Sequence, residues 1–249
     1  MKRLMFILSV LVGMAFGVIS CIDTDLKGNM KTTTEDPAVA TFNYRVGNYT
    51  LLSSNSGEVI VPQETAVELE EGQCVLAQLT FDYDNQPNQY YFTASVVKHK
   101  PVRYSLARLA NTISVQDYDS PIDGVVQLRY DPILRGNYFL RIYGKGVENT
   151  TNYQLLAGRD SVDAETGAHE LYLLSKINTA SGSLVGDNYA FDMSLVLNEF
   201  GRDTIFKATG LEIPLRTVNV NLNYLKKMEN GEPIFSRVNT DPIEIVIYR

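Results

Sequence analysis

The chain has 249 residues, a length typical of one large domain or two small ones. Hydrophobic residues make up 45% of it and charged residues 20%, so it can build a core and is not disordered by composition. The formal net charge of -7 argues against a general nucleic-acid binder, and two histidines and two cysteines nearly exclude a His/Cys zinc site or a cysteine-rich disulfide scaffold.

Residues 1–20 have the pattern of an exported signal sequence. Lys2 and Arg3 give it a positive start, and Leu4–Ile19 is an almost entirely apolar run of 16 residues. That run is shorter than the roughly 20 residues that a membrane-spanning helix needs. We therefore predict a cleaved signal peptide over residues 1–20.

The end of this run, Gly17-Val18-Ile19-Ser20-Cys21, resembles a bacterial lipobox. The resemblance implies cleavage before Cys21 and attachment of acyl chains to its thiol and its amine. Several acyl chains together anchor a protein stably in a membrane. The alternative is an ordinary secretory signal that happens to contain a cysteine. Cleavage would remove two basic residues and no acidic ones, which changes the net charge from -7 to -9.

Residues 21–37 contain few apolar side chains and many Thr, Asp, Lys and Gly residues, so they are predicted to form a flexible tether. Asp23 and Asp25, just after the lipobox, weakly resemble the surface-export signal of certain Gram-negative lipoproteins. We expect a lipid-anchored protein of the cell envelope, attached to the outer membrane. Its sequence is compatible with attachment to the periplasmic face and with attachment to the surface face.

Residues 38–115 are predicted to form a small OB-like β-barrel. Gln73–Tyr83 alternates between apolar and polar residues, and Gln89–His99 forms the returning strand after a turn at residues 85–88. The two strands make a hairpin with long arms, of roughly ten residues each. Long, curved strands in a compact five-strand set favour an OB-like Greek key. Tyr104–Asn111 is expected to form one or two helical turns.

Residues 116–249 are predicted to form an immunoglobulin-like β-sandwich. The domain boundary is placed at the polar stretch Asp117–Gly124, which holds three aspartates, a Ser-Pro step and a glycine. Beyond it several strands alternate between apolar and polar residues, and no window of 12 or more residues shows a helical period. Tyr189–Leu197 is interpreted as one of these strands. Half-buried strands with polar outer faces imply two sheets packed face to face.

The order of these features resembles the NigD-like lipoproteins. The resemblance rests on the lipobox with its acids, on residues 47–52 (GNYTLL) and 71–77 (EGQCVLA), and on residues 168–173 (AHELYL) and 200–204 (FGRDT). It implies an N-terminal OB-like domain and a C-terminal β-sandwich. The family has no established activity, so the resemblance implies an architecture and a location but no reaction.

Cys74, paired with His99 or His169, is the candidate for nucleophilic catalysis. Nothing local marks a base or an oxyanion donor, and a lone cysteine in an alternating strand is usually packed as a small hydrophobe. Two distant histidines do not define a metal site. We therefore assign no catalytic residue, no cofactor and no metal.

Asp117, Asp119 and Asp123 resemble a fragment of a calcium loop, in which oxygen ligands alternate with spacers. Pro121 stands where such a loop needs another ligand, and the distal glutamate is missing. A polar inter-domain loop is therefore favoured, and a weak surface calcium site is kept as a minor hypothesis.

Two segments match a short acceptor pattern for O-glycosylation of exported proteins in related bacteria, Asp160-Ser161-Val162 and Asp203-Thr204-Ile205. Such a three-residue pattern often arises by chance. Ser161 is the better candidate than Thr204, because its surroundings have the composition of a loop.

The lack of a catalytic pattern favours a non-enzymatic envelope protein that binds a glycan, a peptide or a partner protein. One alternative is an envelope hydrolase with an unrecognised carboxylate pair, which two facing acids and a raised carboxyl pKa would mark. Another is a purely structural subunit of an envelope complex, which a large exposed apolar patch would mark. A nucleic-acid partner is not expected at a mature charge of -9.

Overall fold

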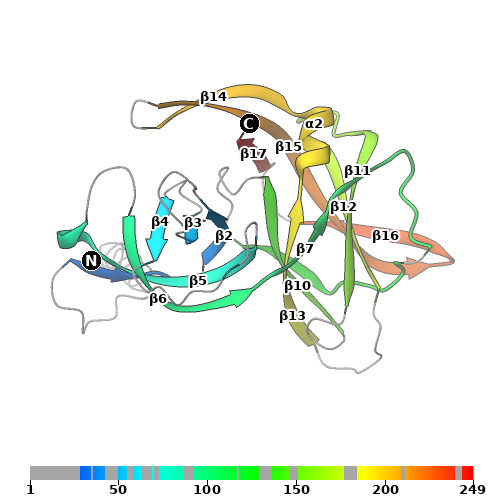
Figure 1. Ribbon diagram of the computed structural model, residues 1–249. Helices are drawn as coiled ribbons and strands as arrows, with labels where there is room; N and C mark the ends of the chain where they lie inside the picture. Colours follow the sequence, from blue (N-terminus) through cyan, green and yellow to red (C-terminus); the bar gives the residue numbers. More distant parts are fainter. Residues whose placement is uncertain are drawn as a thin grey trace, which may run out of the picture.

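The structure of the 249-residue chain is a computed structural model (Figure 1). It describes residues 29–34, 36–42, 50–54, 59–62, 69, 73–86, 92–116, 118–128, 136–145, 151–176, 184–208, 211–238 and 243–248. The predicted signal peptide and Cys21 lie outside these ranges, so cleavage and lipidation stay predictions. Within the described ranges, no helix is both long enough and apolar enough to cross a membrane.

The all-β class is confirmed, and the first sheet closes into the expected OB-like barrel. Its strands follow the order β5-β2-β3-β4-β6, and β6 pairs back with β5. The long hairpin predicted from the alternation is the β5–β6 pair. The strands of this sheet are β1 (Met30–Thr32), β2 (Asp36–Phe42), β3 (Thr50–Ser54), β4 (Val59–Pro62), β5 (Cys74–Asp82) and β6 (Phe92–Pro101).

The barrel begins inside the segment predicted as a flexible tether, residues 21–37. β1 pairs with the end of β5, where the hydroxyls of Thr32 and Thr80 lie 2.8 Å apart. Next to it, the side-chain amide of Asn29 donates to the carboxylate of Asp84 at 2.8 Å. These cross-strand contacts order a segment whose composition alone is that of a tether.

Two sheets make up the second part of the chain. The first has the order β7-β13-β10-β9, with β7 (Arg103–Leu106), β13 (Leu184–Asp192), β10 (Asn137–Lys145) and β9 (Gly124–Gln127). The second has the order β14-β15-β12-β11-β8, and β16 and β17 also pair with β15. Its strands are β14 (Arg202–Ala208), β15 (Leu211–Glu229), β12 (His169–Lys176), β11 (Asn152–Val162), β8 (Arg108–Ala110), β16 (Glu232–Arg237) and β17 (Ile243–Tyr248).

The two sheets pack face to face around one apolar core, which confirms the β-sandwich. One sheet contributes Tyr138, Leu140, Ile142, Tyr189 and Phe191; the other contributes Tyr153, Leu155, Ala157, Leu171, Leu173, Val218, Val220 and Leu222. The pairs β7–β13, β8–β11 and β12–β15 are parallel, so the sandwich contains mixed sheets.

The segment expected to form helical turns, residues 104–111, instead contains strands β7 and β8. Each pairs with a strand of the C-terminal half, β7 with β13 and β8 with β11. Such long-range pairing overrides a weak local preference. The chain therefore passes from the barrel to the sandwich sheets between Pro101 and Arg103, and not at the predicted domain boundary between residues 115 and 116.

The strand expected through Leu197 is also wrong, because β13 ends at Asp192 and helix α2 (Ser194–Phe200) follows. The side chain of Asp192 accepts a hydrogen bond from the backbone N–H of Ser194 at 2.8 Å. Met193, Val196 and Leu197 are buried, at the spacing of three and four residues that one face of a helix requires.

The barrel and the sandwich meet in a small apolar cluster. Cys74 and Leu76 of β5 pack with Val102, with Phe139 of β10 and with Ala190 of β13. The backbone N–H of Val102 donates to the carbonyl of Cys74 at 2.8 Å. This cluster, which we call the joint, covers the outer face of the sheet that contains β10 and β13. Alternate side chains of β5 therefore pack into the barrel core on one face and into the joint on the other.

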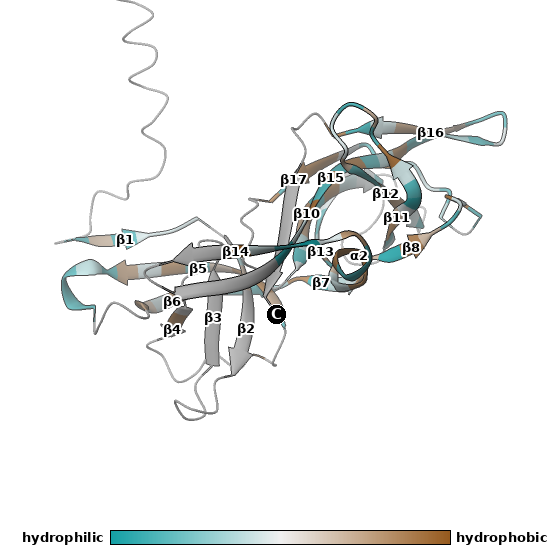
Figure 2. Ribbon diagram, turned by 90° about the horizontal axis from the view of Figure 1, so that it is seen from above, coloured by the Kyte–Doolittle hydropathy of each residue, from teal (hydrophilic) through white to brown (hydrophobic). Residues whose placement is uncertain are grey.

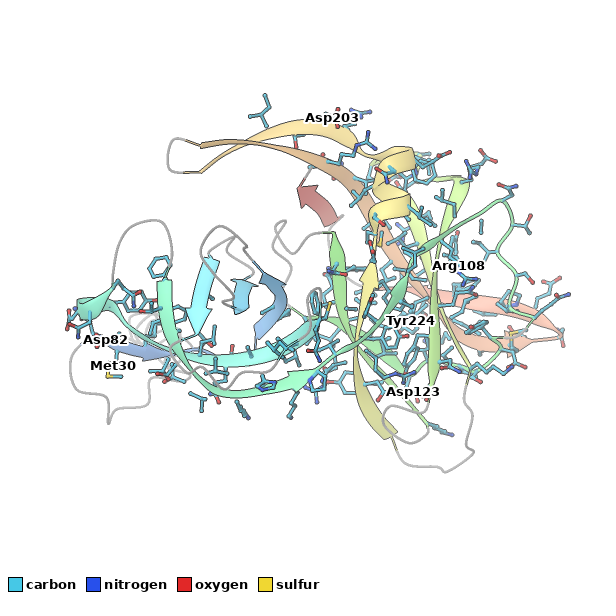
Figure 3. The ribbon with its side chains drawn as sticks, in the orientation of Figure 1. Met30, Asp82, Arg108, Asp123, Asp203 and Tyr224 are labelled. Carbon is cyan, nitrogen blue, oxygen red and sulfur yellow. The ribbon has the colours of Figure 1, made fainter. Side chains whose placement is uncertain are left out.

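Strands β14 and β15 form an arm that extends from the sandwich toward the barrel side of the molecule, and β17 pairs with β15 at the base of this arm (Figure 1). Figure 3 places Asp203 on this arm, away from Asp82 of the barrel. At the opposite end of β15, the β15–β16 hairpin projects from the sandwich and carries hydrophilic residues at its turn (Figure 2). β15 thus contributes to the arm, to the sandwich and to this hairpin.

Candidate functional site

Arg237 of β16 joins two carboxylates on the outer face of the larger sandwich sheet. Its guanidinium donates to Oδ2 of Asp163 at 3.0 Å and to Oε1 of Glu170 at 2.6 Å. Asp163 lies in the turn after β11 and Glu170 lies in β12. We call Asp163, Glu170 and Arg237 the arginine clamp.

Glu170 is the buried member of the clamp, with 9% of its side chain exposed. The amide of Asn221 donates to Oε1 at 3.1 Å, and the amide of Asn223 donates to Oε2. Both asparagines lie on β15, in which Asn221 pairs with Glu170 across the sheet. A buried carboxylate is stable only with such partners, and here an arginine and two amides supply them.

Asp163 is fixed by its own turn. Its Oδ1 accepts hydrogen bonds from the backbone N–H groups of Glu165 and Thr166, at 3.0 and 2.9 Å. The bonds from Thr166 and from Arg237 favour the charged form and lower the pKa of Asp163 to about 2. Gly167 completes the turn at a φ of +69°, a left-handed conformation that favours glycine.

The clamp is not arranged as an acid/base pair. A general acid needs a raised carboxyl pKa, whereas the pKa of Asp163 is lowered. Arg237 occupies the position between the two carboxylates where a reacting group would have to bind. This part of the structure therefore gives no support to the hydrolase alternative. Sequence reasoning missed the clamp because Arg237 lies far along the chain from both acids.

A bulge in β11 shapes the surface next to the clamp. Ala157 pairs with Leu171 and Val162 pairs with His169, so residues 158–161 lie opposite Glu170 alone. A Cβ at Gly158 would lie 2.6 Å from Cβ of Ser161, so this tight path requires glycine.

The two predicted O-glycosylation residues lie in different settings. Ser161 belongs to the β11 bulge rather than to a loop, and its half-buried hydroxyl lies 3.2 Å from the hydroxyl of Tyr172. Thr204 is exposed on β14. Thr204 is therefore the more exposed of the two residues, and glycosylation at either one stays a prediction.

Cys74 is buried in the joint between barrel and sandwich. Burial and the nearby carboxylate of Asp192 raise the pKa of its thiol to about 12. In the β5–β6 pair, His99 lies opposite Ala77. The side chain of Ala77 belongs to the barrel core, whereas the side chain of Cys74 belongs to the cluster between barrel and sandwich. Cysteine and histidine therefore lie on opposite faces of the sheet and do not form a dyad.

His169 lies at the start of β12, and its ring packs against Phe200 of α2 with the centroids 4.0 Å apart and the planes tilted by 30°. Burial lowers the pKa of His169, and its Nδ1 has no hydrogen-bond partner among the described residues. The ring therefore packs α2 against the sheet, and it lies on a different element from Cys74 and His99.

Of the three aspartates in the calcium hypothesis, Asp117 lies outside the described residues. Asp119 and Asp123 are exposed, and the backbone N–H of Asp123 donates to the carbonyl of Tyr143 at 2.9 Å. No group of three or more metal-ligating side chains occurs in the described ranges.

The second candidate site is the edge of β14. Among the described residues β14 pairs only with β15, and Arg202, Asp203, Thr204 and Ile205 are all exposed, so both faces of the strand are accessible. Ile205 is 64% exposed. Arg216 on β15 forms an ion pair with Asp203 at 3.4 Å. An exposed edge strand is a template for pairing with another chain.

The partner of Ile205 on β15 is Pro214. Because proline has no N–H, this pair belongs to the type without direct hydrogen bonds between its two members. The N–H and C=O of Ile205 therefore point away from β15, toward the outer edge of the arm. Because backbone groups alternate in direction along a strand, the N–H and C=O groups of residues 203 and 207 also point toward the outer edge of the arm.

No protein-family model matches the chain, and no curated protein matches its sequence. Solved structures do resemble it. An uncharacterised protein from Parabacteroides merdae has a TM-score of 0.61 and 13% identity over 87% of this chain and 99% of its own. A protein named "putative lipoprotein" from Bacteroides fragilis has a TM-score of 0.55 and 12% identity over 88% of this chain and 97% of its own.

A NigD-like immunity protein from Bacteroides caccae is also among the similar structures, with a TM-score of 0.48 and 13% identity over 85% of this chain and 93% of its own. The lipoprotein name suggested by the sequence resemblance thus recurs among the structural neighbours. At these identities the shared property is the fold. The chain has the two-part, all-β fold of these Bacteroides and Parabacteroides proteins.

Proposed function

We propose that this protein is a non-enzymatic, lipid-anchored module of the bacterial envelope that binds a protein strand through β14. The observation that carries the proposal is the edge geometry of β14, which presents outward N–H and C=O groups and the exposed Ile205. Strand addition to such an edge supplies main-chain hydrogen bonds for affinity and side-chain positions for specificity.

Two further observations support a binding role over the alternatives. In the arginine clamp both carboxylates are occupied by Arg237, so these acids are placed for structure rather than for proton transfer. Among the residues that the structure describes, the exposed apolar side chains include Tyr104, Ile205 and Val126, which lie on three different strands. A structural subunit of a complex would favour one large contiguous patch instead.

The lipid anchor at Cys21 is the second half of the proposal, supported by the lipobox resemblance and by the lipoprotein name of one structural neighbour. It would place the protein at the outer membrane. In fractionated cells, Cys21→Ala should move the protein from the membrane to the soluble fraction. Retention of this variant in the membrane would contradict lipid anchoring.

The binding role is tested by placing a photo-crosslinking amino acid at Thr204, which is exposed on β14. The matched control carries the same amino acid at Glu165, which is exposed in the turn before β12. Illumination of whole cells should give a discrete, higher-mass adduct from position 204 and none from position 165. No adduct from position 204, or the same adducts from both positions, would contradict a binding role for the arm.

A further inference from the structure

We infer that the strand that pairs with β14 is β14 of a second copy of this chain, in an antiparallel register centred on Ile205. The inference rests on the proposed function, because both assign protein binding to the edge of β14. It commits the binding edge to one occupant and one register.

The backbone geometry fits a symmetric pair. Two identical antiparallel strands related by a two-fold axis must place one residue opposite its own copy, because hydrogen-bonded and non-hydrogen-bonded pairs alternate along the ladder. Ile205 turns its N–H and C=O outward, as derived from its pairing with Pro214. With Ile205 at the centre, the two copies exchange these hydrogen bonds directly.

Charge complementarity selects this register. Centring the pair on Ile205 places position 203 of one copy opposite position 207 of the other, which brings an aspartate opposite a lysine on each side of the axis. If the pair is centred on residue 204 or on residue 206 instead, neither aspartate lies opposite a lysine of the other copy. Opposite charges across a strand pair stabilise it and like charges destabilise it.

The exposure of Ile205 fits a central position. A side chain 64% exposed on an edge strand is an aggregation liability unless a partner covers it. A single strand pair is a small interface, so we expect it to be weak in solution. Anchoring in a membrane raises the effective concentration of the copies and favours the pair.

The register is tested by disulfide cross-linking of the full-length protein in its native membrane, in a Cys74→Ala background. In the inferred pair the two Cα atoms at position 205 lie about 5.5 Å apart, within the range that a disulfide bridges. The two Cα atoms at position 204 are offset by two residues and lie roughly 8 Å apart, beyond that range. Ile205→Cys should therefore form a covalent dimer on mild oxidation, and Thr204→Cys should not.

The charge match is tested by the same cross-link with Asp203→Lys or Lys207→Asp added to Ile205→Cys. Each variant alone brings like charges together and should lower the yield of dimer about tenfold. When the two variants are co-expressed with tags of different size, opposite charges meet again and a mixed dimer should form. Arg216→Gln removes the ion pair to Asp203 within one chain, together with the hydrogen bonds from Arg216 to Asn198 at the end of α2. It creates no like-charge contact across the pair, so it should leave the cross-link unchanged.

The outcomes separate this inference from the proposed function. Equal cross-linking at positions 204 and 205, or no recovery on co-expression, would overturn the inferred register. A photo-adduct from Thr204 that contains a different protein, with no dimer from Ile205→Cys, would overturn self-pairing and leave the binding role intact. If position 204 gives no adduct and position 205 no dimer, both fail.

Discussion

Tyr153 donates its hydroxyl to the buried carboxylate of Asp187 at 3.1 Å, across the interior of the sandwich. Tyr153 belongs to β11 and Asp187 to β13, so this hydrogen bond joins the two sheets. Asp187 is only 1% exposed. Burial and the neighbouring carboxylate raise the pKa of Tyr153, which keeps the phenol protonated as a donor.

Tyr153→Phe keeps the ring in the core and removes this donor from a buried carboxylate. Loss of a donor to a buried charged group costs about 1–3 kcal/mol of unfolding free energy. Urea denaturation followed by circular dichroism measures the change. The control is Tyr104→Phe, on a side chain that is 60% exposed, which should shift the midpoint little. Equal midpoints for both variants would contradict the role given to Tyr153.

Arg237→Gln should destabilise the sandwich, because Glu170 then loses a charged partner while it stays buried. We expect a loss of about 1–3 kcal/mol in unfolding free energy. Lys227→Gln is the matched control, since Lys227 pairs with Glu229 at 3.1 Å where both side chains are more than half exposed. Such a surface pair contributes about 0–1 kcal/mol. A control loss as large as that of Arg237→Gln would show that the clamp is no more than a surface ion pair.

The stability of the folded chain should depend on Asp163 at acid pH. Its pKa in the folded state is about 2, below the value of 3.8 for an ordinary aspartate. A lowered pKa stabilises the folded state above the unfolded value, and this contribution is lost as the pH falls from 3.8 toward 2. The urea midpoint of the wild type should therefore fall more steeply over this window than that of Asp163→Asn. Parallel curves would contradict the assignment.

Cys74 should be inert in the folded protein. With a thiol pKa raised to about 12 and a buried side chain, almost no thiolate is present or accessible at pH 8. In a soluble Cys21→Ser form, a thiol reagent should label Cys74 only after denaturation. Tyr104→Cys adds an exposed thiol and should give one rapid labelling event in the native state. Rapid native labelling without the added cysteine would reopen a chemical role for Cys74.

Gly201 should not tolerate a side chain. A Cβ at this position would lie 2.2 Å from the backbone carbonyl oxygen of Leu197, which accepts the N–H of Gly201 at 2.7 Å to end α2. Gly201→Ala must displace the helix end, at a cost of about 1–3 kcal/mol. At Gly124 a Cβ would meet nothing within 4 Å, so Gly124→Ala should be nearly neutral. Thermal unfolding of the two variants makes the comparison.

Strand periodicity identified the sandwich correctly because each side of a strand meets a different environment. Tyr138, Leu140 and Ile142 alternate with Phe139 along β10, and the first three enter the sandwich core while Phe139 enters the joint. At the end of β13 the same alternation led to a wrong prediction, because a helix and not a strand follows Asp192. There the spacing of Met193, Val196 and Leu197 fits a helix, and that signal was present in the sequence.

The candidate sites were harder to predict than the fold. The clamp depends on a bulge in β11 and on the register of β12 against β15, which bring Arg237 to Glu170. Neither feature has a local pattern, because register is set by long-range packing. The sequence around Thr204 indicates only a glycan acceptor, because the place of β14 at the edge of a sheet is a property of topology.

The 19 residues of β15 form one unbroken strand from the arm to the far hairpin. Along its length it pairs in turn with β14, β17, β12 and β16. No flexible hinge separates the arm from the core within this strand. A pulling force applied at the arm would therefore be transmitted along β15 into the centre of the sandwich. The arm would move together with the sandwich and not independently of it.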